Sequence, residues 1–363
     1  MSEQLLNFFG DLCLEGVSKE HFVYGKKLLA EMEKGINIGN LECALTDAIE
    51  EKPMQAHILH CVPENALAYL ENFRIVSLAN NHIQDFFNKG IEDTKARLDK
   101  AGILYFGIGH NFKEALTPLQ TNLDGLKIAF IGASRYANAQ ADLQGTAPEK
   151  LSVLKKSIRS LKELGYFVVP FFHWGYMYQR IPAPREVKIA HACVDYGADL
   201  VLGSHAHIFQ AHEIYHGKEI WYGLGNFIFH PDVASVLSDK GDLRVLRSFF
   251  LQVQIKDGKV ISCTPKWYEI TKSGVELASK ELCYQMEQEL KECSQALQEG
   301  FFGYRRKYYA QAGRIARQSK KMRCQFQKVS ERKFTDKLKI YLDFNFQDLC
   351  NRLAALLPWL FKE

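Results

Sequence analysis

The chain of 363 residues is long enough to form one large domain, or two unequal domains, with a substantial core. Its 47% hydrophobic and 24% charged residues are ordinary for a globular enzyme. It has no run approaching the ~18 apolar residues of a membrane span and no signal-peptide pattern in MSEQLLNFFGD. The net charge of +4 is uneven, because residues 301–340 hold thirteen Lys/Arg and two acidic residues, which leaves −7 on the rest.

The first ~270 residues alternate short apolar runs with amphipathic segments, a pattern typical of an α/β domain with buried sheets. The apolar runs predict strands at Leu5–Phe9, Ile75–Leu78, Leu104–Gly107, Lys127–Ile131, Phe167–Phe172, Leu200–Leu202 and Glu219–Tyr222. The amphipathic segments predict helices at Gly90–Ala101, Pro148–Leu164 and Pro184–Tyr196. Phe249–Ile255 and Val260–Thr264, joined by a glycine-containing turn, predict a hairpin. We therefore expect one α/β domain over residues 1–270.

The pattern changes near residue 271, and we expect a helical, basic extension over residues 271–363. Glu276–Gln298 predicts a helix with one apolar side made by Leu277, Leu282, Met286 and Leu290. Gly300 and Gly303 interrupt that pattern before the basic segment begins. Tyr341–Phe361 predicts a last helix, because Leu353, Leu356, Leu357 and Leu360 recur at helical spacing.

Polar residues cluster just beyond the predicted strands, where α/β sheets build their sites. The clusters are Gly10-Asp11, Asn40-Leu41-Glu42, Asn80-Asn81-His82, His173-Trp174, Ser204-His205-Ala206-His207 and Gly225-Asn226. One such cluster would most often be a turn or a hydrogen-bonded core group. Several together supply Asp, Glu, Asn and His, a mixed nitrogen and oxygen set suited to Mn, Fe or Zn. Alternation along an extended His205-Ala206-His207 segment would place both imidazoles on one side.

The motifs GD, NLE, SLANNH, HWG, GADLVLGSHAH and LGNF occur in an order that resembles the CapA family, over about Leu5 to Thr264. That family is named for poly-gamma-glutamate capsule synthesis and is similar to the calcineurin-like metallophosphoesterases. The resemblance implies a four-layer α-β-β-α sandwich with two β-sheets between helical layers. It also implies a divalent metal cofactor, as one or two ions of Mn, Fe or Zn.

Carried over by motif, the resemblance assigns one metal to Asp11 and His207, with Glu42 as the bridge between two ions. Asn81, His173 and His205 would bind the second ion. His82 would lie beside the ions as a general acid or as a cation for the leaving group. Two ions would polarise a phosphoryl or carbonyl oxygen and acidify a water molecule.

The chain departs from the wider superfamily at Cys13, which stands where Asp-x-His would place a histidine. Packing is the favoured role for Cys13, with soft metal ligation as the alternative. Four further residues are candidates for substrate binding: Asn80, Trp174, Tyr176 and Asn226. For Trp174 and Tyr176 the alternative is packing, and for Asn226 it is orientation of a metal-binding histidine.

The basic segment and the apolar stripe beyond it leave three interpretations open for residues 301–363. The first is a solvated helical face. The second is binding to an anionic membrane surface, with Trp359 and the leucine stripe inserted at the interface. The third is contact with a polyanionic polymer or a polymer-synthesis complex. Nucleic acid is the least favoured partner, because no RNA- or DNA-binding motif accompanies the charge.

Two functional hypotheses from different classes follow. The first is a cytoplasmic, CapA-like metal-dependent phosphoesterase, peripheral at the inner membrane face, that acts on an anionic small molecule or polymer in capsule or cell-surface polymer synthesis. The second is a non-catalytic accessory protein of a polymer-synthesis complex that uses the metal pocket for binding. The ligand set and His82 favour the enzyme, whereas Cys13 and the basic tail favour the accessory protein.

Overall fold

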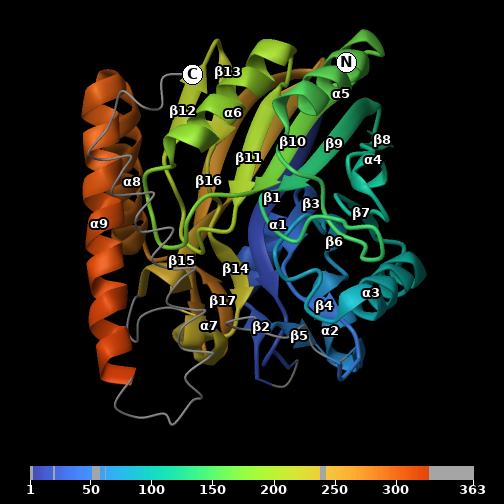
Figure 1. Ribbon diagram of the computed structural model, residues 1–363, viewed down its shortest axis with the longest axis horizontal. Helices are drawn as coiled ribbons and strands as arrows, with labels where there is room; N and C mark the ends of the chain where they lie inside the picture. The colour runs from blue at the N-terminus through green and yellow to red at the C-terminus, as the bar shows by residue number, and fades with distance from the viewer. Residues whose placement is uncertain (1–2, 19–20, 51–57, 62, 238–242, 327–363) are drawn as a thin grey trace. The chain divides into compact units, whose positions relative to one another are not determined.

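The computed structural model describes residues 3–18, 21–50, 58–61, 63–237 and 243–326 (Figure 1). The chain divides into two compact units, residues 1–297 and residues 298–363. Among the described residues, strands of the first unit form two large sheets and one small pair, with helices between them in sequence. The predicted α/β class is therefore confirmed.

The larger sheet is built around β1, a central strand that is buried along most of its length. Its strands lie in the order β2 (Val23–Tyr24), β17 (Gly274–Leu277), β16 (Lys259–Thr271), β15 (Arg247–Lys256), β1 (Glu3–Cys13), β3 (Ile36–Leu41), β6 (Phe73–Ser77) and β7 (Leu104–Phe106), with β14 (Asn226–Phe229) also paired to β1. The predicted hairpin is confirmed as β15 and β16, which pair antiparallel. Its turn contains Asp257 and Gly258, both with positive φ.

The second sheet contains β12 (His212–Tyr215), β13 (Lys218–Trp221), β11 (Leu200–Ser204), β10 (Phe167–His173), β9 (Leu126–Ser134) and β8 (Leu119–Leu123), in that order. A separate pair joins β4 (Ala44–Leu45) and β5 (His60–Cys61). β1, β3, β6 and β7 run parallel in the larger sheet, as do β9, β10, β11 and β13 in the second. The carboxyl ends of these strands therefore share one edge of each sheet.

Helices lie mainly in the connections between parallel strands. They are α1 (Lys26–Met32), α2 (Pro63–Leu70), α3 (Phe87–Ala101), α4 (Phe112–Ala115), α5 (Leu151–Glu163), α6 (Pro184–Tyr196), α7 (Pro231–Leu237) and α8 (Lys280–Gln295), with short 3₁₀ turns η1 (Leu243–Leu246) and η2 (Ala296–Gln298). Parallel strands need such crossovers because a tight turn cannot return the chain in the same direction. The predicted helices within residues 90–196 are confirmed as α3, α5 and α6.

The hydrophobic core has three parts, which follow from the alternation of side chains along the strands. Ile128 and Phe130 of β9 join a cluster that also contains Leu6 and Phe8 of β1. Their neighbours Ala129 and Ile131 face a different cluster, with residues of α5 and α6. A third cluster joins β1 and β6 to α1, α2 and α3. Strands buried on both faces therefore carry the nearly continuous apolar runs seen in the sequence.

The structure corrects the sequence prediction at two strands, β17 and β3. The predicted helix Glu276–Gln298 begins only at Lys280, because residues 274–277 pair with β16 as strand β17. The Ser279 hydroxyl accepts the Leu282 N–H and so caps α8 at its start. β3 was not predicted as a strand, because Asn37, Gly39 and Asn40 give it a weak strand signal. Pairing with β1 and β6 on its two sides holds it in the sheet.

In the second unit, the described residues form α9 (Gly300–Phe326). Gly303, predicted to interrupt the helical pattern, lies inside this helix, so that prediction is wrong. The predicted helix Tyr341–Phe361 lies outside the described residues. Among the helices described, none combines the length and the apolar character needed to cross a membrane. The division of the chain at residue 270 stays a prediction.

Candidate metal centre

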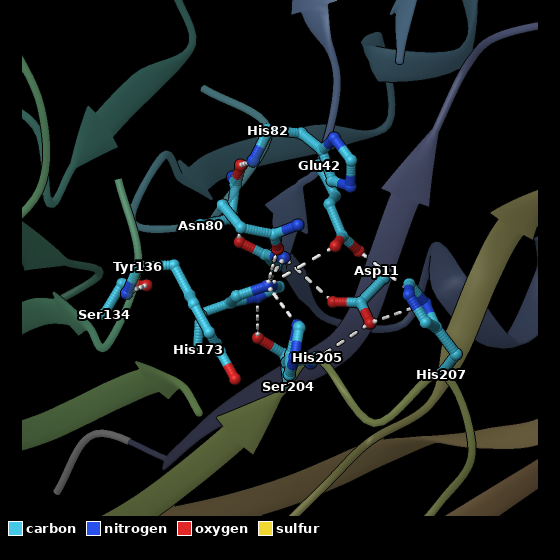
Figure 2. Close-up of polar contacts among 12 residues, drawn as sticks. Asp11, Glu42, Asn80, His82, Ser134, Tyr136, His173, Ser204, His205 and His207 are labelled. Carbon is cyan, nitrogen blue, oxygen red and sulfur yellow. Dashed lines mark hydrogen bonds and ion pairs between the residues drawn. The ribbon is translucent and has the colours of Figure 1, made fainter. Parts of the chain in front are cut away.

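Side chains from both large sheets meet near the carboxyl ends of five parallel strands (Figure 2). They are Asp11 of β1, Glu42 after β3, Asn81 and His82 after β6, His173 at the end of β10, and His205 and His207 after β11. The six predicted ligand residues are linked by a chain of short contacts through their functional atoms. The structure thus brings together residues that lie up to 196 positions apart in the sequence.

One ligand group consists of Asp11, Glu42 and His207, whose candidate ligand atoms all lie within 4.8 Å of one another. His207 Nδ1 lies 3.6 Å from Asp11 Oδ2 and 3.9 Å from Glu42 Oε2. Two carboxylates and one imidazole form a nitrogen and oxygen set that suits a borderline divalent cation. This group could hold one metal ion.

A second group consists of Glu42, His173 and His205, again within 4.8 Å of one another. His173 Nε2 lies 3.4 Å from Glu42 Oε1 and 2.9 Å from His205 Nδ1. The Asn81 amide oxygen lies within hydrogen-bond distance of the same Nε2 atom. The two groups share Glu42, which offers Oε1 to one and Oε2 to the other.

The Glu42 carboxylate gives the strongest indication that a cation belongs here. Glu42 is 0% exposed, and neither of its oxygens has a hydrogen-bond partner among the described residues. A buried carboxylate without partners is costly, unless a cation compensates the charge. Burial raises the pKa of Glu42 and also that of Asp11, where the nearby Glu42 charge adds to the effect. The donor set therefore fits divalent metal.

The imidazoles of the second group are suited to metal binding because they are neutral. Burial lowers the pKa of His173 and of His205 well below the ordinary value, and neighbouring histidines lower both further. A metal ligand must present an unprotonated ring nitrogen. Ser204 Oγ lies 2.9 Å from His173 Nδ1 and so helps to fix the orientation of that ring.

The backbone at His205 and His207 differs from the predicted extended segment. Their φ angles are 90° and 57°, in a region that residues other than glycine rarely adopt. The chain leaves β11 in a bend, and these unusual conformations, rather than strand alternation, direct both imidazoles into the site. The His205 N–H points at Asp11 Oδ2 at 3.3 Å, and Tyr178 N–H donates to Ala206 O at 2.9 Å. Such contacts stabilise the strained segment.

Gly10 and Gly225 allow the backbone around Asp11 to pack closely. A Cβ atom on Gly10 would lie 1.8 Å from Gly225 O, which accepts the Asp11 N–H at 2.8 Å. Gly225 has a φ of 71°, which glycine adopts at little cost. Asn40 Nδ2 donates to Asp11 Oδ1 at 2.8 Å and so leaves Oδ2 facing His207. The GD and LGN motifs thus position one carboxylate.

His82 lies beside these groups and has its own carboxylate partner. Its Nδ1 lies 2.7 Å from Asp85 Oδ2, which also accepts the Leu59 N–H at 2.8 Å. Burial lowers the pKa of His82, but the hydrogen bond and charge of Asp85 more than offset this and raise it. The charge of Glu42 contributes to the same rise. Unlike His173 and His205, His82 is therefore suited to carry a proton.

Two of the predicted substrate-binding residues, Trp174 and Asn80, are fully buried. Trp174 is 0% exposed, stacks on Phe172 with ring centroids 4.4 Å apart, and donates its indole N–H to Tyr222 O. This position satisfies both the apolar ring and the N–H without contact to a ligand. Asn80 is also buried, and its Nδ2 donates to Leu41 O at 2.7 Å while its oxygen accepts the His82 N–H. Asn80 positions the loop that carries His82.

Asn226 contacts a predicted metal ligand, and Tyr176 lies in the loop after β10. Asn226 Oδ1 lies 2.9 Å from His207 Nδ1, and Asn226 Nδ2 donates to Val245 O. Asn226 thus contacts the same ring nitrogen that faces Asp11 and Glu42, so it would orient His207 only with Nε2 as the metal-binding nitrogen. Tyr176 is half-buried, and the guanidinium of Arg135 lies 5.3 Å from its ring centroid.

The sequence interpretation assigned no role to several residues of the site, although Asn40 and Ser204 lie within its polar clusters. They are Asn40, Asp85, Arg135, Tyr136 and Ser204, all of which contact a predicted site residue. Arg135 and Tyr136 follow β9 directly, so the same strand-end argument could have found them. Cys13 lies in the hydrophobic cluster of β1, α1 and α3, and the candidate metal groups among the described residues do not include it.

The chain was then compared with known proteins. A family model described as "Bacterial capsule synthesis protein PGA_cap" matches residues 6–231. "Capsule biosynthesis protein CapA" of Bacillus anthracis is 34% identical over 193 residues, which cover 51% of this chain and 45% of that protein. "PGA biosynthesis protein CapA" of Bacillus subtilis (strain 168) is 30% identical over 190 residues, covering 51% of this chain and 48% of that protein.

A third relative, from Mycobacterium tuberculosis, is named "Probable polyglutamine synthesis accessory protein". It is 29% identical over 228 residues, which cover 57% of this chain and 59% of that protein. The chain thus spans about half the length of the curated relatives it matches. The matched region of the family model contains every residue of the two ligand groups.

Proposed function

The chain belongs to the family of bacterial capsule synthesis proteins described as PGA_cap, and from this premise we propose that it is a metal-dependent hydrolase. Its substrate would be a phosphate ester or a polymer intermediate of capsule or cell-surface polymer synthesis. The observation that carries the proposal is Glu42, whose two buried oxygens lack hydrogen-bond partners among the described residues and belong to two neighbouring ligand groups. The predicted resemblance to the CapA family is confirmed by the comparisons.

In this proposal, Asp11, Glu42 and His207 hold one cation, and Glu42, His173 and His205 hold another, with Asn81 beside the second. Two such ions would supply Lewis acidity toward a phosphoryl oxygen and would acidify a water molecule. Asn40 would orient Asp11 through its other carboxylate oxygen, and Asn226 would hold His207 through Nδ1 with Nε2 as the metal-binding nitrogen.

His82 is the proposed general acid. Asp85 holds its Nδ1 and favours the protonated imidazole, so the proton available to a substrate is the one on Nε2. His82 would give this proton to the leaving-group oxygen. Burial of the surrounding groups excludes water and strengthens these interactions.

We also propose that the two sheets and their helices form the four-layer α-β-β-α sandwich expected from the sequence. The three clusters of the core support this arrangement. One cluster combines strands of both sheets, and the other two combine each sheet with helices.

The test begins with metal analysis of protein purified without chelator, followed by a panel of phosphate monoesters and diesters. His82→Ala should keep the bound metal and lower turnover by roughly 10²–10⁴-fold, the usual contribution of a general acid. The matched control is His191→Ala. His191 is also paired with a carboxylate, that of Glu213, but it lies on α6 and is not one of the predicted site residues. Loss of metal from the His82→Ala protein would contradict the role of His82, and equal turnover in both variants would do the same.

A non-catalytic accessory protein is the second candidate. The accessory protein named among the relatives and Cys13 at the usual histidine position favour it. In that case the protein should bind metal but turn over no ester of the panel. Turnover that depends on both the added metal and His82 would exclude this candidate.

A further inference from the structure

Arg135 and Tyr136 begin a loop that lies against the histidines of the second ligand group. β9 ends at Ser134, which pairs with His173 at the end of the parallel strand β10. The backbone N–H of Arg135 points at the backbone oxygen of His173 at 3.4 Å. The Tyr136 ring lies 4.6 Å from the His205 ring, centroid to centroid, and its hydroxyl donates to Gly175 O at 2.8 Å. Figure 2 shows Tyr136 beside His173 and His205.

The Arg135 guanidinium is half-buried and carries no ion pair with a described carboxylate. Two carboxylates that interact electrostatically with Arg135 have other direct partners. Glu149 is paired with Arg185, and Glu186 accepts the backbone N–H of Ala183. The Arg135 guanidinium lies over the Tyr176 ring, 5.3 Å from its centroid, a contact that holds the cation without neutralising it.

The Arg135 cation is stable in this position even without a salt bridge. Burial lowers the pKa of Arg135, but the neighbouring Tyr176 hydroxyl, together with Tyr136 and Glu186, more than offsets this and raises it. A half-buried charge without a direct ion pair nevertheless has a desolvation cost. An anion bound next to the guanidinium would remove that cost.

Guanidinium groups are well matched to tetrahedral oxyanions. The planar fork donates two parallel hydrogen bonds to two oxygens of one phosphate, an arrangement that a lysine ammonium cannot reproduce. Arg135 directly precedes Tyr136, whose ring contacts His205. The backbone N–H of Arg135 faces His173 O. The backbone of Arg135 therefore lies on the His173–His205 side of the metal centre, and its guanidinium lies over the Tyr176 ring.

We propose that Arg135 is the anion-recognition residue of this site and binds two non-bridging oxygens of a substrate phosphate group, with Tyr176 stacked against the guanidinium. The inference rests on the proposed function for its choice of phosphate over carboxylate. It makes Arg135 a determinant of specificity for phosphate monoesters, whose terminal group offers more free oxygens and more charge than a diester.

The experiment measures binding of inorganic phosphate to the purified full chain by calorimetry, with and without added Mn²⁺. Arg135→Gln should weaken phosphate binding by about 10–100-fold, the range expected for losing one or two charge-assisted hydrogen bonds. Arg135→Lys should recover part of the affinity, because it keeps the charge but not the fork. Metal content and thermal unfolding should match those of the wild type. The control is Arg159→Gln, an exposed position on α5, which should bind phosphate as the wild type does.

Equal phosphate affinity in wild-type and Arg135→Gln protein would overturn the inference. A parallel titration with glutarate distinguishes the two oxyanions. If glutarate binding depends on Arg135 and phosphate binding does not, the assignment to phosphate is wrong. Failure of the proposed function has a different signature: no ester is turned over, yet phosphate binding still falls on substitution of Arg135. That result would support the anion site and refute the hydrolase.

Discussion

Glu42→Gln tests whether the centre is built for metal, because it removes one buried charge and keeps the shape of the side chain. Without metal, the wild-type protein keeps a carboxylate that is 0% exposed and has no hydrogen-bond partner on either oxygen. An unsatisfied buried polar group costs about 1–3 kcal/mol, and a charge costs more. We therefore expect metal-free Glu42→Gln protein to be more stable than the metal-free wild type by about 1–3 kcal/mol.

In the presence of metal, the wild type should instead be more stable than the Glu42→Gln protein. A ligand that binds only the folded state at 100 times its Kd adds about 2.7 kcal/mol of stability. Glu42 contributes to both candidate ligand groups, so Glu42→Gln should lose most of this gain. At about 2 °C per kcal/mol for a large domain, the melting temperature should rise by about 5 °C in the wild type and by little in the variant.

The assay is thermal unfolding of both proteins in chelator and in excess Mn²⁺ or Zn²⁺, with bound metal measured on the same samples. Glu213→Gln is the matched control, because that carboxylate is already paired with His191 and Tyr222 and lies in β12. The Glu213→Gln protein should gain as much thermal stability from added metal as the wild type does. The reasoning is refuted if metal-free Glu42→Gln protein melts below the metal-free wild type, or if both proteins gain equally from metal.

Three further predictions follow from other parts of the chain. Asn226→Ala removes the oxygen 2.9 Å from His207 Nδ1 and should weaken metal affinity by about 10–100-fold in a competition titration; unchanged affinity would contradict the orienting role. Burial raises the pKa of Glu186 to about 8, so the wild type should lose up to about 5 kcal/mol of stability as pH rises from 4.5 to 8. Denaturant unfolding of Glu186→Gln should show a much flatter profile, since glutamine still accepts the Ala183 N–H. We also propose that residues 301–363 bind anionic membranes, so the protein should float with acidic liposomes at low salt but not with neutral ones; failure with both would exclude the proposal.

The strand-end argument found much of the candidate centre because it depends on a simple property of parallel sheets. Their carboxyl ends share one edge, so polar residues after separate strands converge. Glu42, His173 and His205 each follow or end such a strand, and Asp11 lies two residues before the end of β1. The argument could not separate Trp174 from Tyr176, because both follow the same strand. Packing decides between them: Trp174 stacks on Phe172, and Tyr176 stays half-buried.

Local conformation was predicted less well where tertiary contacts override it. Alternation predicted an extended segment at His205-Ala206-His207, yet both histidines have positive φ. Contacts with Asp11 and Tyr178, far away in the sequence, compensate the strain. Likewise, the residues of β3 have a weak preference for strand structure, and pairing with β1 and β6 on its two sides holds β3 in the sheet.

By itself, the sequence determined the α/β class, the two glycine-bearing motifs and the set of nitrogen and oxygen ligands, because each depends on residue type and on spacing along the chain. Only the tertiary structure decided that Glu42 is buried without a hydrogen-bond partner, that Asp85 pairs with His82, and that Arg135 lies over Tyr176 without an ion pair to a described carboxylate. These features depend on distances between strands of two different sheets and on the exclusion of water from them. Burial and counter-charge are properties of the packed molecule, so they appear only when the sheets come together.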